Sequence, residues 1–221
     1  MRRHIKTLLE WMLALALLLL LALPMALVAL IVLMADGVPI LHREQRLGRH
    51  GRRFTLAKFR TLRSSDGASV APVGDSRIFP AAAPLRRWRL DELPQLLNVL
   101  RGDMALVGPR PLPARHAEAL PSETRSRLLQ VRPGVTGRSA LAFLGDDVAL
   151  AGLDDFEERY LRDVLPAKVA LDVDYLDHWS LAADFALLAQ TLRQIVSRSA
   201  REQSRDQVRR LLDAHGSQEQ R

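Results

Sequence analysis

Two adjacent carboxylates, Asp91 and Glu92, follow a short run of arginines in the chain. The arginines are Arg86, Arg87 and Arg89. A pattern of leucines typical of a short helix comes next, so Asp91 is predicted to cap the N-terminus of that helix, with Pro94 in its first turn and Gly102 just after its end. Carboxylates and guanidinium groups at the positive end of a helix dipole form a site suited to a phosphate.

An ordinary structural role explains the same residues. Aspartate is one of the commonest helix N-caps, and an arginine beside Asp91 and Glu92 is often only part of a surface ion pair. Catalysis is therefore one of two interpretations of this stretch, and the rest of the chain has to decide between them.

The composition limits the partners and the chemistry. The 221 residues carry a formal net charge of +7, which indicates an anionic partner: a membrane surface, a nucleic acid or a phosphorylated substrate. Nucleic-acid binding rests on the charge alone, without interleaved aromatic residues or a known motif, so we predict no nucleic-acid partner. Because the chain has no cysteine, disulfides and thiolate metal sites are excluded, and a metal would be bound by oxygen or imidazole.

An uncharged apolar run at residues 11–35 is long enough to cross a bilayer as one helix. Basic residues flank the run on both sides, whereas a single span usually has them on one side. Pro24, near the middle of the run, can bend the helix. We therefore favour a re-entrant membrane anchor whose two ends stay on the same face of the membrane; a straight span and a cleaved signal peptide are the alternatives.

Residues 39–63 are predicted to form two short extended segments around a turn between Gly48 and Gly51. Lys58 and Arg60 would share one face of the second segment, and a basic surface resting on anionic lipid explains them as well.

The later segments are predicted from periodicity and turn residues. They are a long loop at 64–84, a helical pattern ending near Val131, a rigid turn at 132–137, a helical pattern at 154–165, and two helices at 168–196 that Ser180 separates and caps. Trp179, Leu181 and Phe185 suit either a helix in the membrane interface or an internal core. Residues 197–221 form a charged tail without an assigned function.

Several segments together resemble the bacterial sugar transferases, which are membrane-bound polyprenyl-phosphate phosphoglycosyl transferases, here of the monotopic type in its minimal form. The matching segments, in family order, are residues 37–48, 54–62, 85–95, 102–111, 131–137 and 171–175. Ordered motifs at compatible spacing are far more specific than any one motif. The resemblance implies a mainly helical α/β fold: a re-entrant membrane helix at 1–36, a compact catalytic domain of amphipathic helices with a small sheet at 37–196, and the tail at 197–221.

The resemblance also implies a two-step transfer of a sugar-1-phosphate from a nucleotide diphosphate sugar, expected to be a UDP-sugar, to polyprenyl phosphate. Asp91 would attack the sugar-bearing phosphate to form an aspartyl phosphosugar, Glu92 would assist, and Mg²⁺ would be the cofactor with Asp91 as its protein ligand. The substrate-binding residues it implies are Lys58, Arg60, Arg86, Gln95, Arg110, Arg132 and Asp172.

The same resemblance implies a place at the bacterial inner membrane, with the catalytic domain on the cytoplasmic face. There the enzyme would start surface polysaccharide or glycoconjugate synthesis, with membrane lipids and downstream glycosyltransferases as partners. The sequence departs from the family where Leu23 precedes Pro24 and where Arg138 follows Gly137, so the choice of sugar stays open. The alternative function is a non-catalytic membrane-surface scaffold that binds anionic lipids or glycosyltransferases, which would have no need of paired carboxylates.

Overall fold

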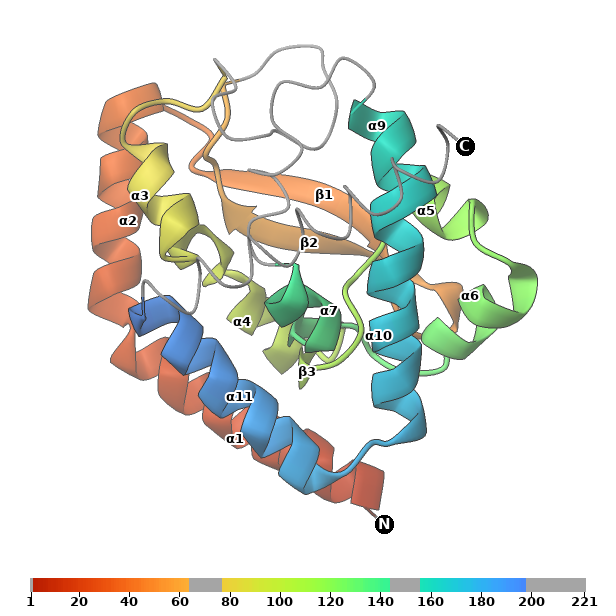
Figure 1. Cartoon of the computed structure of the whole chain (residues 1–221). Helices are drawn as coiled ribbons and strands as arrows, with labels where there is room; N and C mark the ends of the chain where they lie inside the picture. The colour runs from red at the N-terminus through yellow and green to blue at the C-terminus, as the bar shows by residue number, and fades with distance from the viewer. Residues whose placement is uncertain (1, 64–76, 144–155, 198–221) are drawn as a thin grey trace.

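A computed structural model describes residues 2–63, 77–143 and 156–197 (Figure 1). Its first two helices, α1 (Arg2–Leu20) and α2 (Ala22–Asp36), meet at a bend of 61°. The bend falls at Leu21 because Pro24 has no N–H for the carbonyl of Leu20 and its ring crowds that carbonyl. The predicted bend within the apolar run is confirmed.

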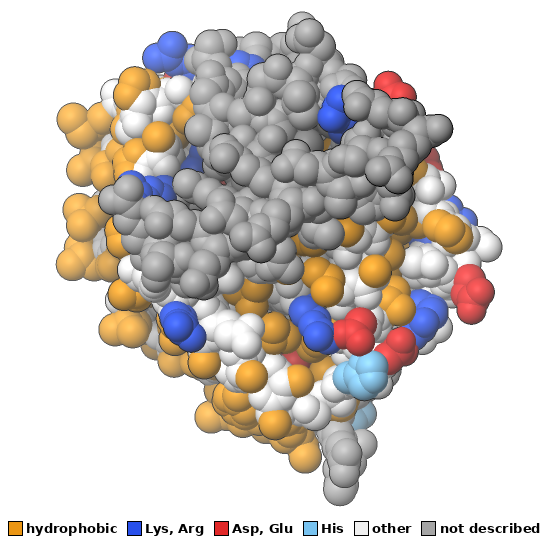
Figure 2. Space-filling view, in the orientation of Figure 1, with side chains coloured by type: hydrophobic (Ala, Val, Ile, Leu, Met, Phe, Trp, Pro, Cys, Tyr) orange, Lys and Arg blue, Asp and Glu red, His pale blue; other side chains and the backbone are white. Residues whose placement is uncertain are grey.

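Across the described ranges, no single helix is long and apolar enough to span a membrane, and His4–Leu20 with Ala22–Asp36 reaches that length and composition only as a bent pair. Large apolar side chains on both helices are exposed. They include Leu8, Met12, Leu15, Leu19, Leu23, Leu27, Leu30 and Met34. Orange side chains gather along the left and lower edges of Figure 2, where Figure 1 places α2 and α1.

Strands β1 (Leu41–Leu47) and β2 (Arg53–Phe59) form an antiparallel hairpin joined by the 3₁₀ turn η1 (Arg49–Gly51). The register places His42 opposite Lys58. The two predicted extended segments and the turn between them are confirmed.

Helix α3 (Ala82–Arg87), the 3₁₀ turn η2 (Leu90–Glu92) and helix α4 (Gln95–Leu100) follow. The loop predicted to reach residue 84 ends sooner, at α3, and its residues 64–76 lie outside the described part of the chain. The prediction that Asp91 caps α4 is wrong. Pro94 takes the capping position, since its fixed backbone angle begins the α-helix there, while Asp91 lies in η2, where the Glu92 N–H bonds the Arg89 carbonyl. Gly102, at φ +83°, follows the end of α4 as predicted.

Strands β3 (Ala105–Val107) and β4 (Gly134–Thr136) form a second, parallel two-stranded sheet. The short helices α5 (Ala114–Glu118) and α6 (Ser122–Leu128) connect them. The prediction of a rigid turn at 132–137 is therefore wrong for 134–136. A Cβ at Gly134 would lie 2.2 Å from the backbone nitrogen of Gly108, so only glycine allows the two backbones to approach this closely.

The remaining described elements are helical. They are α7 (Arg138–Ala142), α9 (Phe156–Arg159), the π-helical turn η3 (Tyr160–Val164), α10 (Leu165–Asp177) and α11 (Leu181–Val196). The Ser180 hydroxyl accepts the Ala183 N–H at 3.0 Å, which confirms the predicted cap. Trp179 packs against the core whereas Phe185 is 59% exposed, so the core interpretation holds for the first and not for the second. The predicted tail, from residue 198 on, lies outside the described ranges.

Within the described residues, three clusters of buried side chains make up the core. The first joins Ala14 of α1 to Phe54 of β2 and Val99 of α4, and the third joins Val32 of α2 to Phe59 of β2. The bent pair α1–α2 therefore packs against the hairpin and α4 instead of standing apart from them (Figure 1). In the part of the chain that the structure describes, the predominance of helix with two small sheets confirms the predicted mainly helical α/β fold.

Candidate active site

The carboxylates of Asp91 and Glu92 lie in η2, between α3 and α4. Arg89, just before η2, has φ +53°, in the left-handed region that residues with a Cβ rarely adopt. This conformation lets its guanidinium reach Glu92, with 2.6 Å between Nη2 and Oε2. Strained backbone conformations of this kind are concentrated at functional sites.

Glu92 is held as a carboxylate by two arginines. In addition to the contact with Arg89, the Nη2 atom of Arg110 lies 3.8 Å from Oε1 of Glu92. Burial alone would raise the pKa of this carboxyl, but the charges of Arg89 and Arg110 outweigh it and lower the pKa to about 2. Glu92 is therefore ionised throughout the physiological range.

Asp91 has the opposite electrostatic environment. Burial and the neighbouring charge of Glu92 raise the pKa of the Asp91 carboxyl from 3.8 to about 6, although Lys58, Arg86 and Arg89 act in the other direction. An aspartate that is ionised at neutral pH, yet poorly stabilised as an anion, has the reactivity expected of a nucleophile.

Lys58 approaches the carboxylates from the hairpin. Strand alternation and register put it on the same face as His42, Glu44 and Arg46. Burial lowers the pKa of Lys58, and the charges of Asp91 and Glu44 counter that shift. Burial, followed by the nearby charge of Lys58, lowers the pKa of His42 as well. The hairpin thus supplies a partly desolvated cation to Asp91.

Arg110 reaches the site from the segment after β3. Its backbone N–H donates to Oδ2 of Asp172 at 3.0 Å, and the Ser139 N–H approaches Oδ1 of the same carboxylate at 3.3 Å. Burial raises the pKa of Asp172 to about 6 despite these hydrogen bonds. Asp172, from α10, therefore binds the backbone that carries Arg110.

The structure brings together five of the predicted site residues. They are Lys58, Arg86, Asp91, Glu92 and Arg110, with Asp172 behind Arg110. Of the other three, Arg60 is paired with Asp36 at 3.2 Å and donates to the carbonyl of Gly37 at 2.9 Å, at the C-terminal end of α2. Arg132 contacts α1, and Gln95 is buried at the start of α4. Their role in substrate binding stays a prediction.

Sequence reasoning missed part of this arrangement. The ion pair of Arg46 with Glu44, at 2.6 Å on the Lys58 face of the hairpin, could have been found by applying strand alternation to β1 as well as to β2. The conformation of Arg89 and its contact with Glu92 could not be predicted, because no sequence signal indicates a left-handed arginine.

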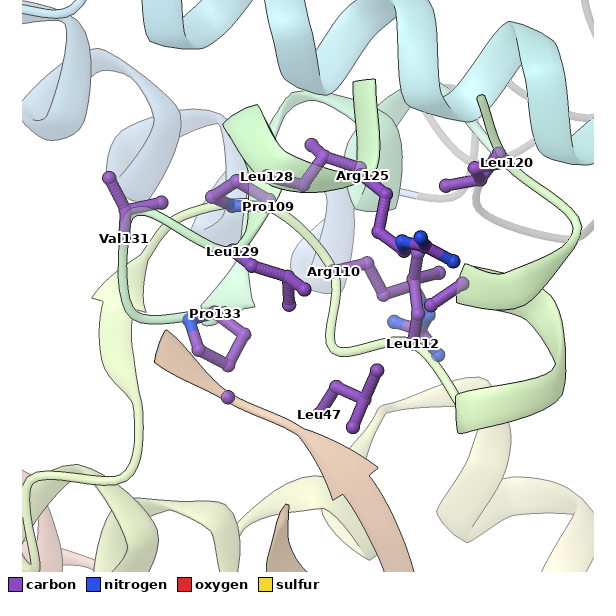
Figure 3. A pocket seen from close by; sticks show the side chains of 12 residues that line it. Leu47, Pro109, Arg110, Leu112, Leu120, Arg125, Leu128, Leu129, Val131 and Pro133 are labelled. Atoms are coloured by element: carbon purple, nitrogen blue, oxygen red, sulfur yellow. The ribbon is translucent and has the colours of Figure 1, made fainter. Parts of the chain in front are cut away.

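A small cavity is lined in part by Arg110 (Figure 3). It encloses about 20 Å³, enough for a single water. Apolar side chains from β1, α5 and α6 and the Pro109 and Pro133 rings form most of its wall, and Arg110 and Arg125 supply its charged groups. Arg110 thus contributes both to the wall of this cavity and, through its contact with Glu92, to the carboxylate site.

Among the described residues, no group of three histidine, aspartate or glutamate side chains is placed to bind a metal ion. Mg²⁺ does not require such a group, because it commonly binds through one or two carboxylates together with substrate phosphates and water. Both Glu92 oxygens face arginines, so Asp91 is the carboxylate available to an ion, and its hard oxygen donors fit magnesium.

Comparison with known proteins gives consistent matches. The family model described as bacterial sugar transferase matches residues 1–198. The uncharacterized sugar transferase EpsL of Bacillus subtilis is 37% identical over 163 residues, which are 72% of this chain and 71% of that protein.

Two relatives with named activities are similarly close. The UDP-glucose:undecaprenyl-phosphate glucose-1-phosphate transferase of Caulobacter vibrioides is 36% identical over 77% of this chain and 62% of its own length. The undecaprenyl-phosphate galactose phosphotransferase of Salmonella typhimurium is 32% identical over 74% of this chain and 34% of its own length. The chain therefore spans only part of these two relatives. The predictions of the family and of a transferase enzyme are confirmed: the chain belongs to the bacterial sugar transferase family.

Proposed function

We propose that the protein transfers a sugar-1-phosphate from a nucleotide diphosphate sugar to polyprenyl phosphate through a covalent intermediate on Asp91. The observation that carries the proposal is the pair of adjacent carboxylates with opposite pKa shifts, Asp91 raised to about 6 and Glu92 lowered to about 2. The names of the two relatives with stated activities, which specify UDP-glucose, undecaprenyl phosphate and galactose, support this substrate class.

In the first step, an Oδ atom of Asp91 attacks the phosphorus that bears the sugar. The new bond joins this oxygen to that phosphorus, and the bond to the bridging oxygen of the diphosphate breaks. The nucleoside monophosphate leaves with the bridging oxygen and its electron pair. No proton is required for attack, because the carboxylate is already ionised above its pKa of about 6.

In the second step, a phosphate oxygen of polyprenyl phosphate attacks the same phosphorus. The bond between that phosphorus and the Asp91 oxygen breaks, which regenerates the carboxylate and releases a polyprenyl-diphosphate-linked sugar. Two displacements at one phosphorus return the enzyme to its starting state.

The surrounding charges explain how a carboxylate can approach a phosphate. Lys58 and Arg86 face Asp91, and Arg110 faces Glu92, so cations reach the site from β2, α3 and the segment after β3. These groups neutralise the diphosphate and the charge of the transition state. Glu92 fixes Arg89 and Arg110 in place. Mg²⁺, when bound, would add further neutralisation of the diphosphate, held by Asp91 and phosphate oxygens.

We further propose that the exposed apolar surface of α1 and α2 anchors the protein as a re-entrant hairpin in the bacterial inner membrane, with the active site on the cytoplasmic face. A polyprenyl phosphate presents its phosphate at the level of the lipid headgroups, so the acceptor and Asp91 have to meet there. The bend of 61° at Leu21 supports this topology, because two helices that meet at an angle can enter and leave the membrane on the same face.

A non-catalytic scaffold is the alternative, and an assay of the two half-reactions distinguishes it. The purified protein is incubated with polyprenyl phosphate, Mg²⁺ and, separately, UDP-glucose and UDP-galactose, and UMP release is measured. We expect UMP release with at least one donor, and a mass increase on Asp91 equal to the phosphosugar when the acceptor is left out. Turnover retained by Asp91→Asn would rule out the covalent mechanism. A wider panel of UDP-sugars, with no UMP release from any, would favour the scaffold.

A further inference from the structure

A single buried acid on α1 connects the proposed membrane hairpin to the catalytic segment. The side chain of Glu10 is only 8% exposed, although it lies on a helix whose neighbouring residues are mostly apolar. A charged group in such a position is costly unless it is fully paired, so its contacts indicate what it does.

The contacts of Glu10 lead to β3. Its Oε1 atom accepts the backbone N–H of Leu106 at 3.1 Å and of Val107 at 3.2 Å. One turn earlier on α1, Lys6 donates to the carbonyl of Val107 at 3.0 Å. Strand β3 belongs to a two-stranded sheet, so β4 covers one of its edges, and α1 satisfies backbone groups that β4 does not.

The charges of this network balance. Glu10 pairs with Lys6 at 2.9 Å and with Arg132 at 3.4 Å, and Lys6 also pairs with Asp184 of α11 at 2.6 Å. Asp184 in turn accepts hydrogen bonds from Tyr175 and Trp179. Two acids and two bases compensate one another, which offsets the cost of burying the Glu10 carboxylate against the backbone of β3. Figure 1 shows α1 and α11 running side by side where these residues join them.

The segment after β3 is too closely packed to absorb a displacement. The N–H of Gly108 donates to the carbonyl of Thr136, and the N–H of Gly134 donates to the carbonyl of Pro109. Arg110 comes next, with its own N–H fixed by Asp172. A shift of Val107 would therefore be passed to Arg110 within three residues.

We propose that Glu10 is a positioning residue for the transferase reaction: by binding the backbone N–H groups of Leu106 and Val107, it sets the position of Arg110 beside Glu92. The inference rests on the proposed function, in which Arg110 receives the diphosphate. It makes the apolar hairpin part of the active-site scaffold as well as an anchor.

Two conservative substitutions separate positioning from simple charge pairing. Glu10→Asp keeps the charge but withdraws the carboxylate from β3 by about 1.5 Å, the length of one carbon–carbon bond. Glu10→Gln loses the charge but keeps an oxygen that can accept the Leu106 and Val107 N–H groups. Thr7→Val is the matched control, because it removes a hydrogen bond to Arg132 from the same helix and leaves both contacts with β3.

Binding of UDP, the probe, is measured by titration calorimetry on the full chain, with each substitution placed in the Asp91→Asn background so that no turnover occurs. We expect the Kd for UDP to rise about tenfold in Glu10→Asp, corresponding to a modest displacement of one cation, and to change by less than about threefold in Glu10→Gln and Thr7→Val. In the Asp91 enzyme, Glu10→Asp should likewise raise the KM for the sugar donor, which a loss of folded protein alone does not do.

The relative UDP affinities of Glu10→Asp and Glu10→Gln decide whether Glu10 acts by positioning β3. Weaker UDP binding by Glu10→Gln than by Glu10→Asp, or equal binding by both, would overturn the positioning role and leave the proposed function untouched. No UDP binding by any variant, including Asp91→Asn alone, would contradict the proposed donor and the inference with it.

Discussion

Replacing Asp91 by asparagine should abolish turnover and, at neutral pH, make the folded protein more stable. The carboxyl has its pKa raised from 3.8 to about 6, chiefly by burial and then by the charge of Glu92. A shift of about two units corresponds to about 3 kcal/mol of disfavoured ionisation in the folded state. The partial solvent exposure of Asp91 and its coupling to Glu92 reduce this energy. We therefore expect the free energy of unfolding of Asp91→Asn to exceed that of wild type by about 1 to 3 kcal/mol at pH 7.5.

The sign of the effect depends on pH. A carboxyl whose pKa is higher in the folded than in the unfolded state contributes stability below the unfolded pKa and loses that contribution as the pH rises through the folded value. Wild type should therefore lose stability relative to Asp91→Asn between about pH 4 and pH 6, and the difference should be constant above that range.

The measurement is thermal unfolding of both proteins in detergent micelles with EDTA present, at pH 4 and at pH 7.5. For a chain of this size, 1 to 3 kcal/mol corresponds to a rise of roughly 2 to 12 °C in Tm at pH 7.5. Asp103→Asn, the same substitution outside the carboxylate pair, is the control. An Asp91→Asn protein that is no more stable than wild type at pH 7.5, or equally stabilised at both pH values, would refute the argument that the fold holds Asp91 in an unfavourable charged state.

Three further predictions test the site and the fold. The kcat/KM measured by UMP release should fall about tenfold for each pH unit below about 6, because the Asp91 carboxylate has to be ionised to attack; a profile that is flat from pH 5 to 7.5 would contradict this. Gly134→Ala should cost about 3 kcal/mol or more in the free energy of unfolding, since the new Cβ would lie 2.2 Å from the backbone nitrogen of Gly108, and an unchanged Tm would show that the strands separate easily. Ser180→Ala should cost about 1 kcal/mol through loss of the hydrogen bond to the Ala183 N–H, a Tm decrease of about 2 to 4 °C, with activity retained in the remaining folded protein.

Features that depend on neighbouring residues could be predicted from the sequence. The hairpin of β1 and β2 was predictable because its turn glycines and alternating side chains are local signals. The break between α10 and α11 was predictable because Ser180 has the chemistry of an N-cap, and the bend between α1 and α2 because Pro24 acts on its own helix. The ordered motifs also identified the cluster of Lys58 with the carboxylates.

Features that depend on distant contacts could not be predicted in this way. Strand β4 has only three residues, and its partner β3 lies about thirty residues earlier, so residues 134–136 have no strand signal of their own. The separation of η2 from α3 depends on the left-handed conformation of Arg89, which its contact with Glu92 stabilises. The role of Glu10 could not be predicted from the sequence. An acid that directly precedes an apolar run is expected only to mark the boundary of that run, and the partners of Glu10 in β3 are far away in the sequence.

The difference in acidity between Asp91 and Glu92 explains why the sequence motif that contains them forms an active site only in this fold. Asp91 and Glu92 are neighbours in the sequence and equally close to a basic stretch, so the sequence alone assigns them similar acidity. The left-handed turn at Arg89 and the approach of Arg110 from β3 both favour the charged form of Glu92, and burial, together with the charge thereby fixed on Glu92, raises the pKa of Asp91. The glutamate is the more stable anion because the arginines contact it directly. The aspartate is the more reactive one because burial and the adjacent charge of Glu92 disfavour its ionised form, and in the proposed reaction it can form a bond to phosphorus while Glu92 keeps the cations in place.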